Sequence, residues 1–553
     1  MASTATRRRL FRRTATILAL GLVAAACGGG GGGGNNGGGS ASGGSEGTPV
    51  YGGTLKYGLE AETADGWCLP EAQLAISGIM VARSIYDTLT RPDANGEYQP
   101  WLAQSVTPSN DYKTWTIKIR PNIKFTDGTP LTAQVVKNNL DAYRGAYPAR
   151  KPQLFIFTFS NIASTAVTAP DTVTVTMKEP WVAFNAYLYG SGRVGMMAQS
   201  QLDDPKTCAT KLVGTGPFML KDWVPNQKMD LVKNPNYWGK DAEGRKLPYL
   251  DGVEFLPIVE VDQRVNALQS GDIDAMHTSD PSTIAQLRDT AKGGSVKLTE
   301  SSDFGEISYN MLNSSVAPFN NLKARQALAY AFNFDDYNQV RGRGILKQAN
   351  GPFAPGSIGN MSTNDFPKFD LNKAKELVKA YEQETGKKLE FTYTTVQAAS
   401  TVADAQFLKD AASKAGIKVS IATVDQSTLI DTALQGKFQA VGWRNHPGGD
   451  PDEQFVWWQS TSPVNFGRFK DPEIDKLLNE GRTTPDKAQR TTIYDDLNKR
   501  FASQVYNLWT YYTDWAIATT DKVHNVMGEG PTAAKPFPGL AVGNPVMYMW
   551  KDK

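Results

Sequence analysis

The stretch that decides the fold runs from residue 389 to 451 and reads LEFTYTTVQAASTVADAQFLKDAASKAGIKVSIATVDQSTLIDTALQGKFQAVGWRNHPGGDP. Segments 389–393 and 417–421 have the apolar and β-branched composition of buried strands. Between them, 402–415 has the apolar spacing of a helix and is followed by Gly416, a residue that often ends helices. A helix that connects neighbouring strands in this way makes them parallel, with a right-handed crossover. We therefore predict an α/β fold here.

A second helix and strand extend this unit and lead into a loop. Residues 428–434 are predicted to be helical and 438–443 to form a strand, while the loop at 442–451 is too rich in glycine and proline for a core. Ligands of α/β sheets bind outside the carboxyl ends of the strands, so we expect a binding surface here, with a solvated turn as the alternative. The candidate ligand contacts in this loop are Trp443, Arg444, Asn445, His446 and Asp450.

The region before this unit is predicted to be a mixed sheet with scattered helices, up to about residue 310. Its strand-like segments are separated by Gly, Pro and Asp turns. They lie at 54–59, 115–119, 173–177, 218–223 and 230–233. Two helices are then expected, at 322–332 and 370–386, the second with Asp370 as its N-cap and Gly386 at its end.

Length and composition exclude several classes of protein. The chain has 553 residues, 40% apolar and 21% charged, which is more than one hydrophobic core supports. The formal charge is +2, but five arginines fall in the first 26 residues, where there are no acidic residues. Removing these five from the 58 basic residues leaves 53 against 56 acidic ones, so the charge of −3 gives no sign of nucleic-acid binding. No later apolar run reaches 18 residues, which excludes a multispan membrane protein.

The first 53 residues have the pattern of an export signal and a tether. Arginines precede a short apolar run, so residues 1–26 are predicted to be a signal peptide. The run ends in LVAAAC, which resembles a bacterial lipobox with Cys27 as the lipidated residue, although Ala24 stands where that pattern prefers leucine. Ordinary cleavage with an incidental cysteine is the alternative. Residues 27–53 are rich in glycine and serine, which predicts a flexible tether that holds an extracytoplasmic protein at the cell membrane.

Two cysteines remain after this segment, Cys68 and Cys208. In an oxidising compartment an even pair indicates a disulfide, and two buried free thiols are the alternative.

Motifs for bond chemistry are missing from the sequence. The three histidines, His277, His446 and His524, have no acidic or cysteine neighbours at metal-ligand spacing. No zinc-protease motif, P-loop or dinucleotide fingerprint occurs outside the glycine tract. We therefore expect neither catalysis nor a metal or other cofactor. A tethered extracellular hydrolase that uses scattered carboxylates remains the alternative, because spacing in sequence does not reveal spacing in space.

Several stretches together resemble the family 5 extracellular solute-binding proteins, the large peptide and nickel type receptors of ABC importers. The resemblance covers nearly all of residues 50–550, and most of the motif residues are structural. The stretches are 85–89 (IYDTL), 100–105 (PWLAQS), 115–120 (WTIKIR), 125–133 (FTDGTPLTA), 214–218 (GTGPF), 233–238 (KNPNYW), 267–274 (ALQSGDID) and 324–331 (ARQALAYA).

The resemblance implies a periplasmic-binding-protein-like fold of two lobes with the ligand enclosed between them. Lobe one would comprise 54–312 and 505–553, with an inserted subdomain at about 86–213, and lobe two 313–504. The implied partners are a peptide or other solute and the permease of an ABC importer, and the implied state is a monomer. The sequence does not distinguish an importer receptor from a sensor or adhesion module, which would bind the ligand without delivering it.

The resemblance also assigns candidate ligand contacts. Relatives that bind peptides stack them on a tryptophan, which Trp443 matches, and pair the peptide ammonium with an aspartate shortly after it. Asn445 or His446 stands there instead, so Asp450, Asp514 or Asp65 would have to supply the charge. Aromatic candidates for the cleft are Trp67, Trp443, Trp458, Tyr511 and Tyr512. Arg444 is a candidate partner for a carboxylate.

Overall fold

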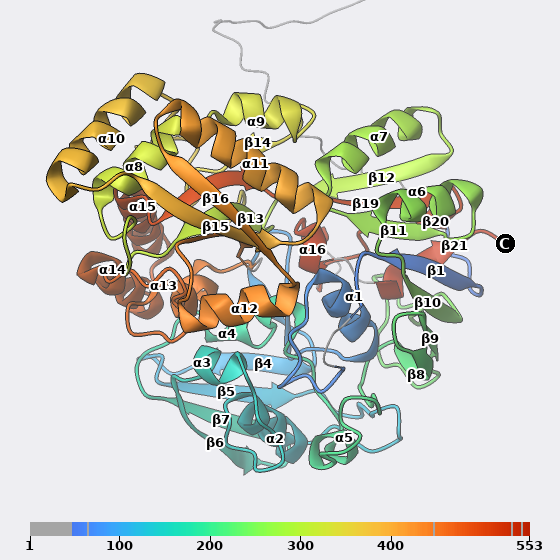
Figure 1. Cartoon of the computed structure of the whole chain (residues 1–553). Helices are drawn as coiled ribbons and strands as arrows, with labels where there is room; N and C mark the ends of the chain where they lie inside the picture. The colour runs from blue at the N-terminus through green and yellow to red at the C-terminus, as the bar shows by residue number, and fades with distance from the viewer. Residues whose placement is uncertain (1–46, 63–65, 446–447, 532–534, 544–545) are drawn as a thin grey trace, which may run out of the picture. The chain divides into compact units, whose positions relative to one another are not determined.

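The structure is a computed structural model that describes residues 47–553, except 63–65, 446–447, 532–534 and 544–545 (Figure 1). The predicted signal peptide, Cys27 and most of the predicted tether lie outside the described residues, as do Asp65 and His446. Within the described part of the chain, no helix combines the length and the hydropathy that a membrane span requires.

The unit predicted from the sequence forms half of a six-stranded sheet. β15 (Glu390–Val396) is parallel both to β16 (Lys418–Val424) and to β17 (Ala440–Arg444), and α11 (Ala399–Lys414) makes the first crossover. Gly416 has a φ of 88°, a value that glycine adopts without strain. The α/β prediction is thus confirmed, and the helix begins three residues earlier than predicted.

The other half of this sheet comes from distant parts of the chain. The strand order is β14-β18-β13-β17-β15-β16, with β14 (Lys347–Gln348), β18 (Asn507–Tyr512) and β13 (Ile307–Leu312) paired antiparallel. The helices of this region are α8 (Leu322–Ala331), α9 (Phe334–Val340), α10 (Leu371–Thr385), α12 (Gln426–Gln435), α13 (Phe455–Trp458), α14 (Pro472–Thr483) and α15 (Lys487–Gln504). The predicted N-cap is confirmed, since Asp370 accepts a hydrogen bond from the Lys373 N–H, and Gly386 ends α10.

A seven-stranded mixed sheet is built from the N-terminal region and one C-terminal strand. Its order is β12-β19-β11-β1-β10-β9-β8, and β1 (Thr54–Leu59) is parallel to its neighbours β10 (Gly252–Pro257) and β11 (Ala275–Thr278). The remaining strands are β12 (Val296–Ser301), β19 (Trp515–Thr520), β9 (Lys228–Lys233) and β8 (Phe218–Val224). The helices that accompany it are α1 (Ile76–Ile85), α6 (Val261–Ser270) and α7 (Pro281–Lys292).

An antiparallel four-stranded sheet lies within the segment between β1 and β8 (Figure 1). It contains β4 (Ala103–Pro108), β5 (Thr114–Ile119), β7 (Thr172–Met177) and β6 (Ile162–Ala169) in that order. Smaller elements nearby are β2 (Thr90–Pro92), β3 (Tyr98–Pro100), α2 (Ala133–Tyr143), α3 (Phe155–Thr158), α4 (Phe184–Tyr187), η1 (Gly190–Gly192) and α5 (Gln199–Asp203). The last short elements of the chain are η2 (Pro451–Gln454), β20 (Val523–His524), α16 (Leu540–Gly543), η3 (Val546–Tyr548) and β21 (Trp550–Lys551).

The chain passes between the two large sheets twice, once between β12 and β13 and once between β18 and β19. Buried apolar side chains form one large cluster around the seven-stranded and four-stranded sheets and another around the six-stranded sheet. A smaller third cluster lies between the seven-stranded sheet and the helices α6 and α7. The two large cores give the molecule two lobes, which we call lobe one and lobe two in that order.

Candidate functional site

The carboxyl ends of strands from both large sheets meet at one place. Glu60 directly follows β1, Ser279 and Asp280 follow β11, and Arg444 ends β17. The Arg444 guanidinium donates to the Ser279 hydroxyl at 3.2 Å, and its Nη1 lies 3.3 Å from Oε2 of Glu306. We call these five residues the strand-end cluster. The contact from Arg444 to Ser279 joins lobe two to lobe one.

Charge in the strand-end cluster is unevenly compensated. Glu306 is 11% exposed and also accepts a hydrogen bond from the Trp515 indole at 3.2 Å, whereas the Arg444 side chain remains 42% exposed. The charge of Glu306 raises the pKa of Arg444. Burial raises the pKa of Glu60, and the positive charges of Arg444 and Arg264 oppose this increase. Glu306 thus has a direct ion pair and a hydrogen bond, and no such contact is seen for the Glu60 carboxylate among the described residues.

Two predicted aromatic residues lie beside this cluster. Trp443 precedes Arg444 in β17, is half-buried and packs its ring 5.5 Å from that of Phe466. Tyr511 pairs with Ser308 across β13 and stacks on Tyr337 at 6.1 Å. Both side chains keep part of their surface accessible, so each has an aromatic face to offer to a ligand.

The polar residues after Trp443 hold the structure together. The Asn445 side chain accepts a hydrogen bond from the Ile307 N–H at 2.7 Å, which fixes the start of β13. Asp450 accepts from Arg490 at 2.7 and 2.5 Å and also caps η2. The structure thus brings Trp443 and Arg444 to the cluster, while Asn445 and Asp450 serve the backbone and an internal ion pair.

Asp514, in the second passage between the lobes, has a cationic partner of its own. Its carboxylate lies 3.3 Å from the Arg288 guanidinium, which also binds Glu300. Burial, followed by the charge of Glu300, raises the pKa of Asp514 to about 6. Asp514 and Glu300 therefore share Arg288 as their cationic partner.

Three other predicted aromatic contacts are parts of the cores. Trp67 is 1% exposed and packs against Trp223, and Trp458 is 3% exposed and packs against Phe501. Tyr512 is buried, and its hydroxyl is hydrogen-bonded to two asparagine side chains. Composition alone does not distinguish such residues from aromatic groups that line a cleft.

The sequence did not lead to Glu60, Ser279, Asp280 or Glu306. The rule that pointed to the loop after β17 applies equally to the residues after β1 and β11, so Glu60 and Ser279 carried a usable signal. Glu306 carried none, because its role depends on an arginine that lies 138 residues further along the chain.

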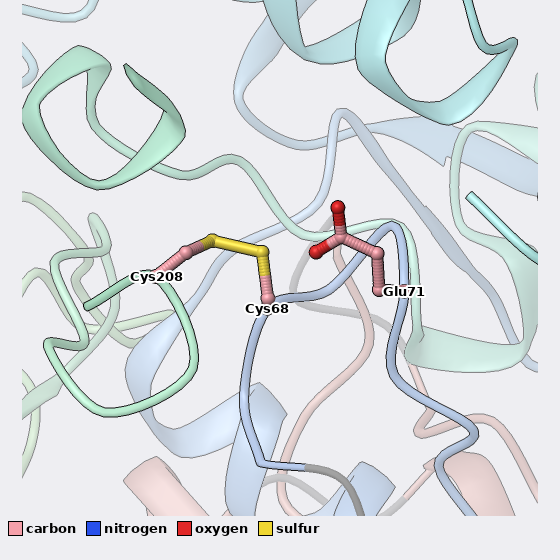
Figure 2. A group of neighbouring side chains, drawn as sticks. All are labelled: Cys68, Glu71 and Cys208. Carbon is pink, nitrogen blue, oxygen red and sulfur yellow. A yellow bond between two sulfur atoms is a disulfide. The ribbon is translucent and has the colours of Figure 1, made fainter. Parts of the chain in front are cut away.

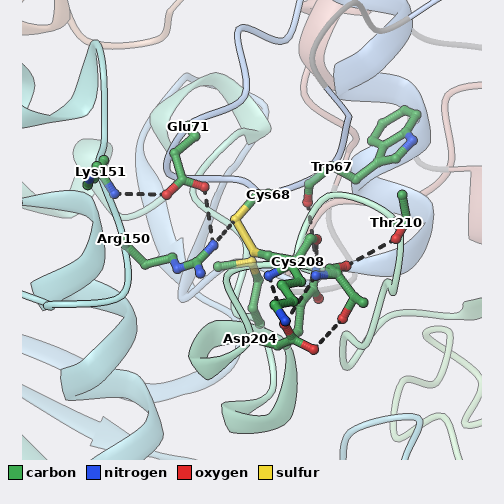
Figure 3. Close-up of a disulfide and its surroundings, with 12 residues drawn as sticks. Trp67, Cys68, Glu71, Arg150, Lys151, Asp204, Cys208 and Thr210 are labelled. Carbon is green, nitrogen blue, oxygen red and sulfur yellow. Dashed lines mark hydrogen bonds and ion pairs between the residues drawn. A yellow bond between two sulfur atoms is a disulfide. The ribbon is translucent and has the colours of Figure 1, made fainter.

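Cys68 and Cys208 form a disulfide (Figure 2). Arg150 donates to the Cys68 sulfur and pairs with Glu71 at 3.3 Å; both contacts are drawn as dashed lines in Figure 3. Because both sulfurs are bonded to each other, neither is a thiolate that binds a metal. This group is therefore a structural crosslink within lobe one.

Three more carboxylates lie close together and have partners within the protein. They belong to Asp241, Glu243 and Glu529. Asp241 accepts from Tyr249 and Arg245, Glu243 pairs with Arg245 at 2.6 Å, and Glu529 accepts from the Ala242 N–H. Each of these three carboxylates thus has a partner within the protein.

Away from the strand ends, the four-stranded region contacts lobe two through buried polar groups. The Asp452 carboxylate is fully buried and accepts from the Trp181 indole at 2.7 Å and from Arg482 at 3.0 Å. Tyr187 donates to the Asp452 carbonyl and accepts from Arg482. We call these four residues the Asp452 contact.

A small cavity lies next to the Asp452 contact. It is lined by Tyr187, Arg193 and Glu453 among others and has a volume of about 30 Å³, enough for about two water molecules. Burial and the charge of Asp450 raise the pKa of Glu453 to about 8, against a hydrogen bond from Tyr98. The cavity is too small for an organic solute, so the strand-end cluster remains the candidate site.

Comparison with known proteins identifies relatives along most of the chain. The model of the bacterial extracellular solute-binding proteins, family 5 middle region, matches residues 97–466. The glutathione-binding protein GsiB of Escherichia coli strain K12 is 29% identical over 432 residues, which cover 75% of this chain and 80% of that protein.

Solved structures share the fold. DppA of Helicobacter pylori, in complex with the peptide STSA, has a TM-score of 0.78 at 23% identity and covers 91% of this chain and 99% of its own. AppA of Bacillus subtilis, in complex with a nonapeptide, has a TM-score of 0.76 at 22% identity, with 92% and 100% covered. NikZ of Campylobacter jejuni, in complex with Ni(L-His), has a TM-score of 0.73 at 20% identity, with 87% and 97% covered. The predicted two-lobed periplasmic-binding-protein-like fold is confirmed.

Proposed function

Since the chain belongs to the family 5 bacterial extracellular solute-binding proteins, we propose that it captures a peptide, a peptide-like solute or another large organic solute and delivers it to the permease of an ABC importer. Members of this family are extracytoplasmic binding proteins of ABC importers, not enzymes, and the chain is one of them. The hydrolase alternative is therefore set aside. GsiB is named as a glutathione-binding protein and two structural relatives hold peptides, which supports a peptide-like solute.

The contact between Arg444 of lobe two and Ser279 of lobe one carries this proposal. It brings the carboxyl ends of strands from both large sheets together, where ligands of α/β sheets bind. A solute at this place touches polar groups of lobe one and the aromatic faces of Trp443 and Tyr511 on lobe two. We propose lobe bounds of 54–312 with 505–553 for lobe one, including a subdomain at about 86–213, and 313–504 for lobe two, except that β13 and β18 at these bounds are strands of the six-stranded sheet and so belong to lobe two.

Solute binding acts by favouring the closed arrangement of the lobes. A ligand shifts an equilibrium between open and closed forms only through its higher affinity for one of them. A solute that contacts both lobes meets this condition, because the open form offers half of its contacts. The apparent affinity for the solute is lower when a smaller fraction of the empty protein is already closed. The transporter then distinguishes loaded from empty protein by its shape.

The N-terminal segment supplies the proposed attachment to the membrane. Lipidation at Cys27 followed by the glycine-rich stretch places the folded protein on a tether. A flexible coil of this length has a reach of about 25 to 30 Å. The last residues of the predicted tether are bound to lobe one instead, since the Gly52 N–H donates to the Tyr249 carbonyl at 3.0 Å and the Tyr51 hydroxyl donates to the Lys246 carbonyl at 2.7 Å. Replacement of Cys27 by serine should move the protein from the membrane fraction to the soluble extracytoplasmic fraction, and unchanged membrane association would contradict the lipid anchor.

Native mass spectrometry of the purified full-length protein tests the proposed function. We expect a bound organic solute of defined mass that is released intact on denaturation. The solute should reduce hydrogen exchange at the strand-end cluster in both lobes. Chemical conversion of the solute during incubation, or protection confined to one lobe, would contradict the proposal.

A further inference from the structure

A second interface joins the two lobes away from the strand-end cluster, where the inserted region of lobe one meets η2 and the loop before it in lobe two. The Tyr98 hydroxyl, from β3, accepts a hydrogen bond from the Gly449 N–H and donates one to Oε2 of Glu453, both at 3.0 Å. The Val182 N–H donates to the Arg482 carbonyl oxygen at 2.9 Å. Because the two groups of each bond belong to different lobes, these bonds exist only while the lobes are closed.

Glu453 differs from the two other acidic residues of this segment. Asp452 pairs with Arg482 at 3.0 Å, and Asp450 pairs with Arg490, so both have counter-charges within lobe two. Glu453 forms no ion pair with any residue that the structure describes. Its Oε2 accepts from two neutral donors, the tyrosine hydroxyl of the inserted region and the Asp450 N–H at 3.3 Å. The charge of Glu453 is thus the one that closure has to enclose without a direct counter-charge among the described residues.

Charged and titratable groups face Glu453 from both lobes. Those of lobe two are the two aspartates and their arginine partners, which compensate each other. The inserted region contributes Arg193, whose pKa burial lowers to about 10, and three tyrosines that stay neutral because burial raises their pKa. These tyrosines are Tyr98, Tyr187 and Tyr189. The positive charge of Arg193 lowers the pKa of Glu453 by less than burial and the charge of Asp450 raise it. The closed interface therefore favours the neutral form of Glu453.

The small cavity described above lies across the same interface. Glu453 lines it together with Tyr187 and Arg193 of the inserted region and Trp457 of lobe two. A volume of about 30 Å³ admits about two water molecules, too few to hydrate a carboxylate as bulk water does. Enclosure in the closed form therefore penalises the ionised carboxylate. When the lobes separate, bulk water reaches Glu453 and this penalty is removed.

We propose that Glu453 makes closure of the lobes depend on pH, with its protonated form favouring the closed arrangement and its ionised form favouring the open one. This inference rests on the proposed function and names a regulation of solute capture. In the closed form, burial and the charge of Asp450 raise the pKa of Glu453 to about 8, and opening removes the part that comes from burial against the inserted region. Closure therefore takes up a proton below pH 8, and the resulting stabilisation of the closed form is lost as pH rises towards 8.

Hydrogen exchange in the full-length protein, freed of any retained solute, tests this dependence without a ligand. It is measured at pH 5.5 and 7.5, and each rate is corrected for the effect of pH on intrinsic exchange. Peptides that contain Gly449 and Val182 report on the interface, because the N–H groups of both residues donate across it. Their protection should fall by about tenfold at pH 7.5, while β15 in the core of lobe two keeps its protection.

The variant Glu453→Gln tests the residue, with Glu97→Gln as the matched control. Glutamine is neutral at both pH values and still serves the capping box at η2, so the interface of this variant should stay protected at pH 7.5. Glu97 pairs with Lys487 across the same interface, but both side chains are more than half exposed. Exposed pairs of this kind contribute little, so Glu97→Gln should keep the pH dependence of the wild type.

Titration calorimetry with named probes extends the test to solute capture. The probes are glutathione, the tetrapeptide Ser-Thr-Ser-Ala and the dipeptide Met-Leu. Any probe that binds should bind the wild type about tenfold more weakly at pH 7.5 than at pH 5.5, relative to the change seen with Glu453→Gln. Titration of the probe itself affects both proteins equally and cancels in this comparison. At pH 7.5 the variant should bind more tightly than the wild type, a gain that misfolding would not produce.

Several outcomes overturn the assignment. Equal corrected protection of the interface at both pH values does so, and so does a pH effect that Glu453→Gln retains. Loss of interface protection in Glu453→Gln at both pH values would show that the carboxyl group is needed for packing rather than for a response to pH. Probe binding without the expected pH effect contradicts the role of Glu453 while the proposed function stands. A protein that retains no solute and binds no probe contradicts the proposed function, and the exchange measurement still decides the role of Glu453.

Discussion

Replacing Asp452 with asparagine should lower the free energy of unfolding by about 3 to 5 kcal/mol, the typical cost of breaking a buried ion pair. The Asp452 side chain is fully buried and Arg482 is 9% exposed, so water does not screen their charges. Asparagine has nearly the same volume and opens no cavity. The loss therefore comes from leaving the Arg482 guanidinium, stacked 3.5 Å from the Phe455 ring centroid, without its counter-charge.

Urea unfolding at 25 °C, followed at once by far-UV circular dichroism and tryptophan fluorescence, measures this loss. Asp496→Asn is the matched control, because it breaks an ion pair with Lys499 in which both side chains are about half exposed. Exposed pairs of this kind contribute little to stability, so the control should match the wild type. If Asp452→Asn costs less than about 1 kcal/mol, the reasoning from burial is wrong.

A double variant separates charge from packing at the same place. Arg482→Met in the Asp452→Asn background removes the orphaned charge and keeps an unbranched apolar side chain against Phe455. Part of the lost stability should return, because a buried polar pair replaced on both sides costs less than one broken on one side. A further loss of stability in the double variant would instead assign the effect to the contacts that Arg482 makes with Tyr187 and other neighbours.

Three further predictions concern the site, the crosslink and pH. Trp443→Ala should weaken binding of the retained solute by about tenfold or more, measured by titration calorimetry, because the half-buried ring offers its free face to the ligand. The melting temperature should change little. An unchanged affinity would show that β17 is not part of the site. Replacing Cys68 and Cys208 with serine should lower the free energy of unfolding by at most about 5 kcal/mol, the chain-entropy value for the loop that the disulfide closes. The melting temperature of this variant should no longer depend on reductant. A reductant effect that persists would contradict the prediction. Because burial and the charge of Asp450 raise the pKa of Glu453 from 4.5 to about 8, the folded protein retains a proton that the unfolded chain has released in this pH range. Stability should therefore fall as pH rises from 4.5 to 8, and Glu453→Gln should flatten that part of the pH profile of unfolding; an identical profile would refute the assigned pKa.

Local patterns in the sequence were sufficient to predict the α/β unit of lobe two. Alternation in 389–393 and 417–421, helical spacing between them and Gly416 at the helix end are all short-range signals, and β15, α11 and β16 follow them. The pairing of β13 with both β17 and β18 was not predictable in this way, because it joins segments about 130 and 200 residues apart.

The candidate site was predicted only on the side of lobe two, although the same rule applies to the strand ends of lobe one. The rule that ligands bind beyond strand ends led to Trp443 and Arg444, which the structure places there. It did not reveal that Asp450 is bound by Arg490 or that Trp458 is buried, because both depend on residues far away in the sequence. The sequence therefore offered polar and aromatic candidates near the loop, but it did not show which of them are buried or bound to other residues of the protein.

The Asp452 contact bears on solute affinity although it lies outside the strand-end cluster. Asp452 and Arg482 both belong to lobe two and stay paired in any arrangement of the lobes, whereas Trp181 and Tyr187 come from the inserted region. When the lobes separate, water replaces the hydrogen bonds from the Trp181 indole to the Asp452 carboxylate, from Tyr187 to the Asp452 carbonyl and from Arg482 to the Tyr187 hydroxyl. Each of these bonds that involves a charged group contributes about 1.5 to 3 kcal/mol. That free energy favours closure before any solute arrives. The solute must therefore supply only the remainder, through its contacts with both lobes.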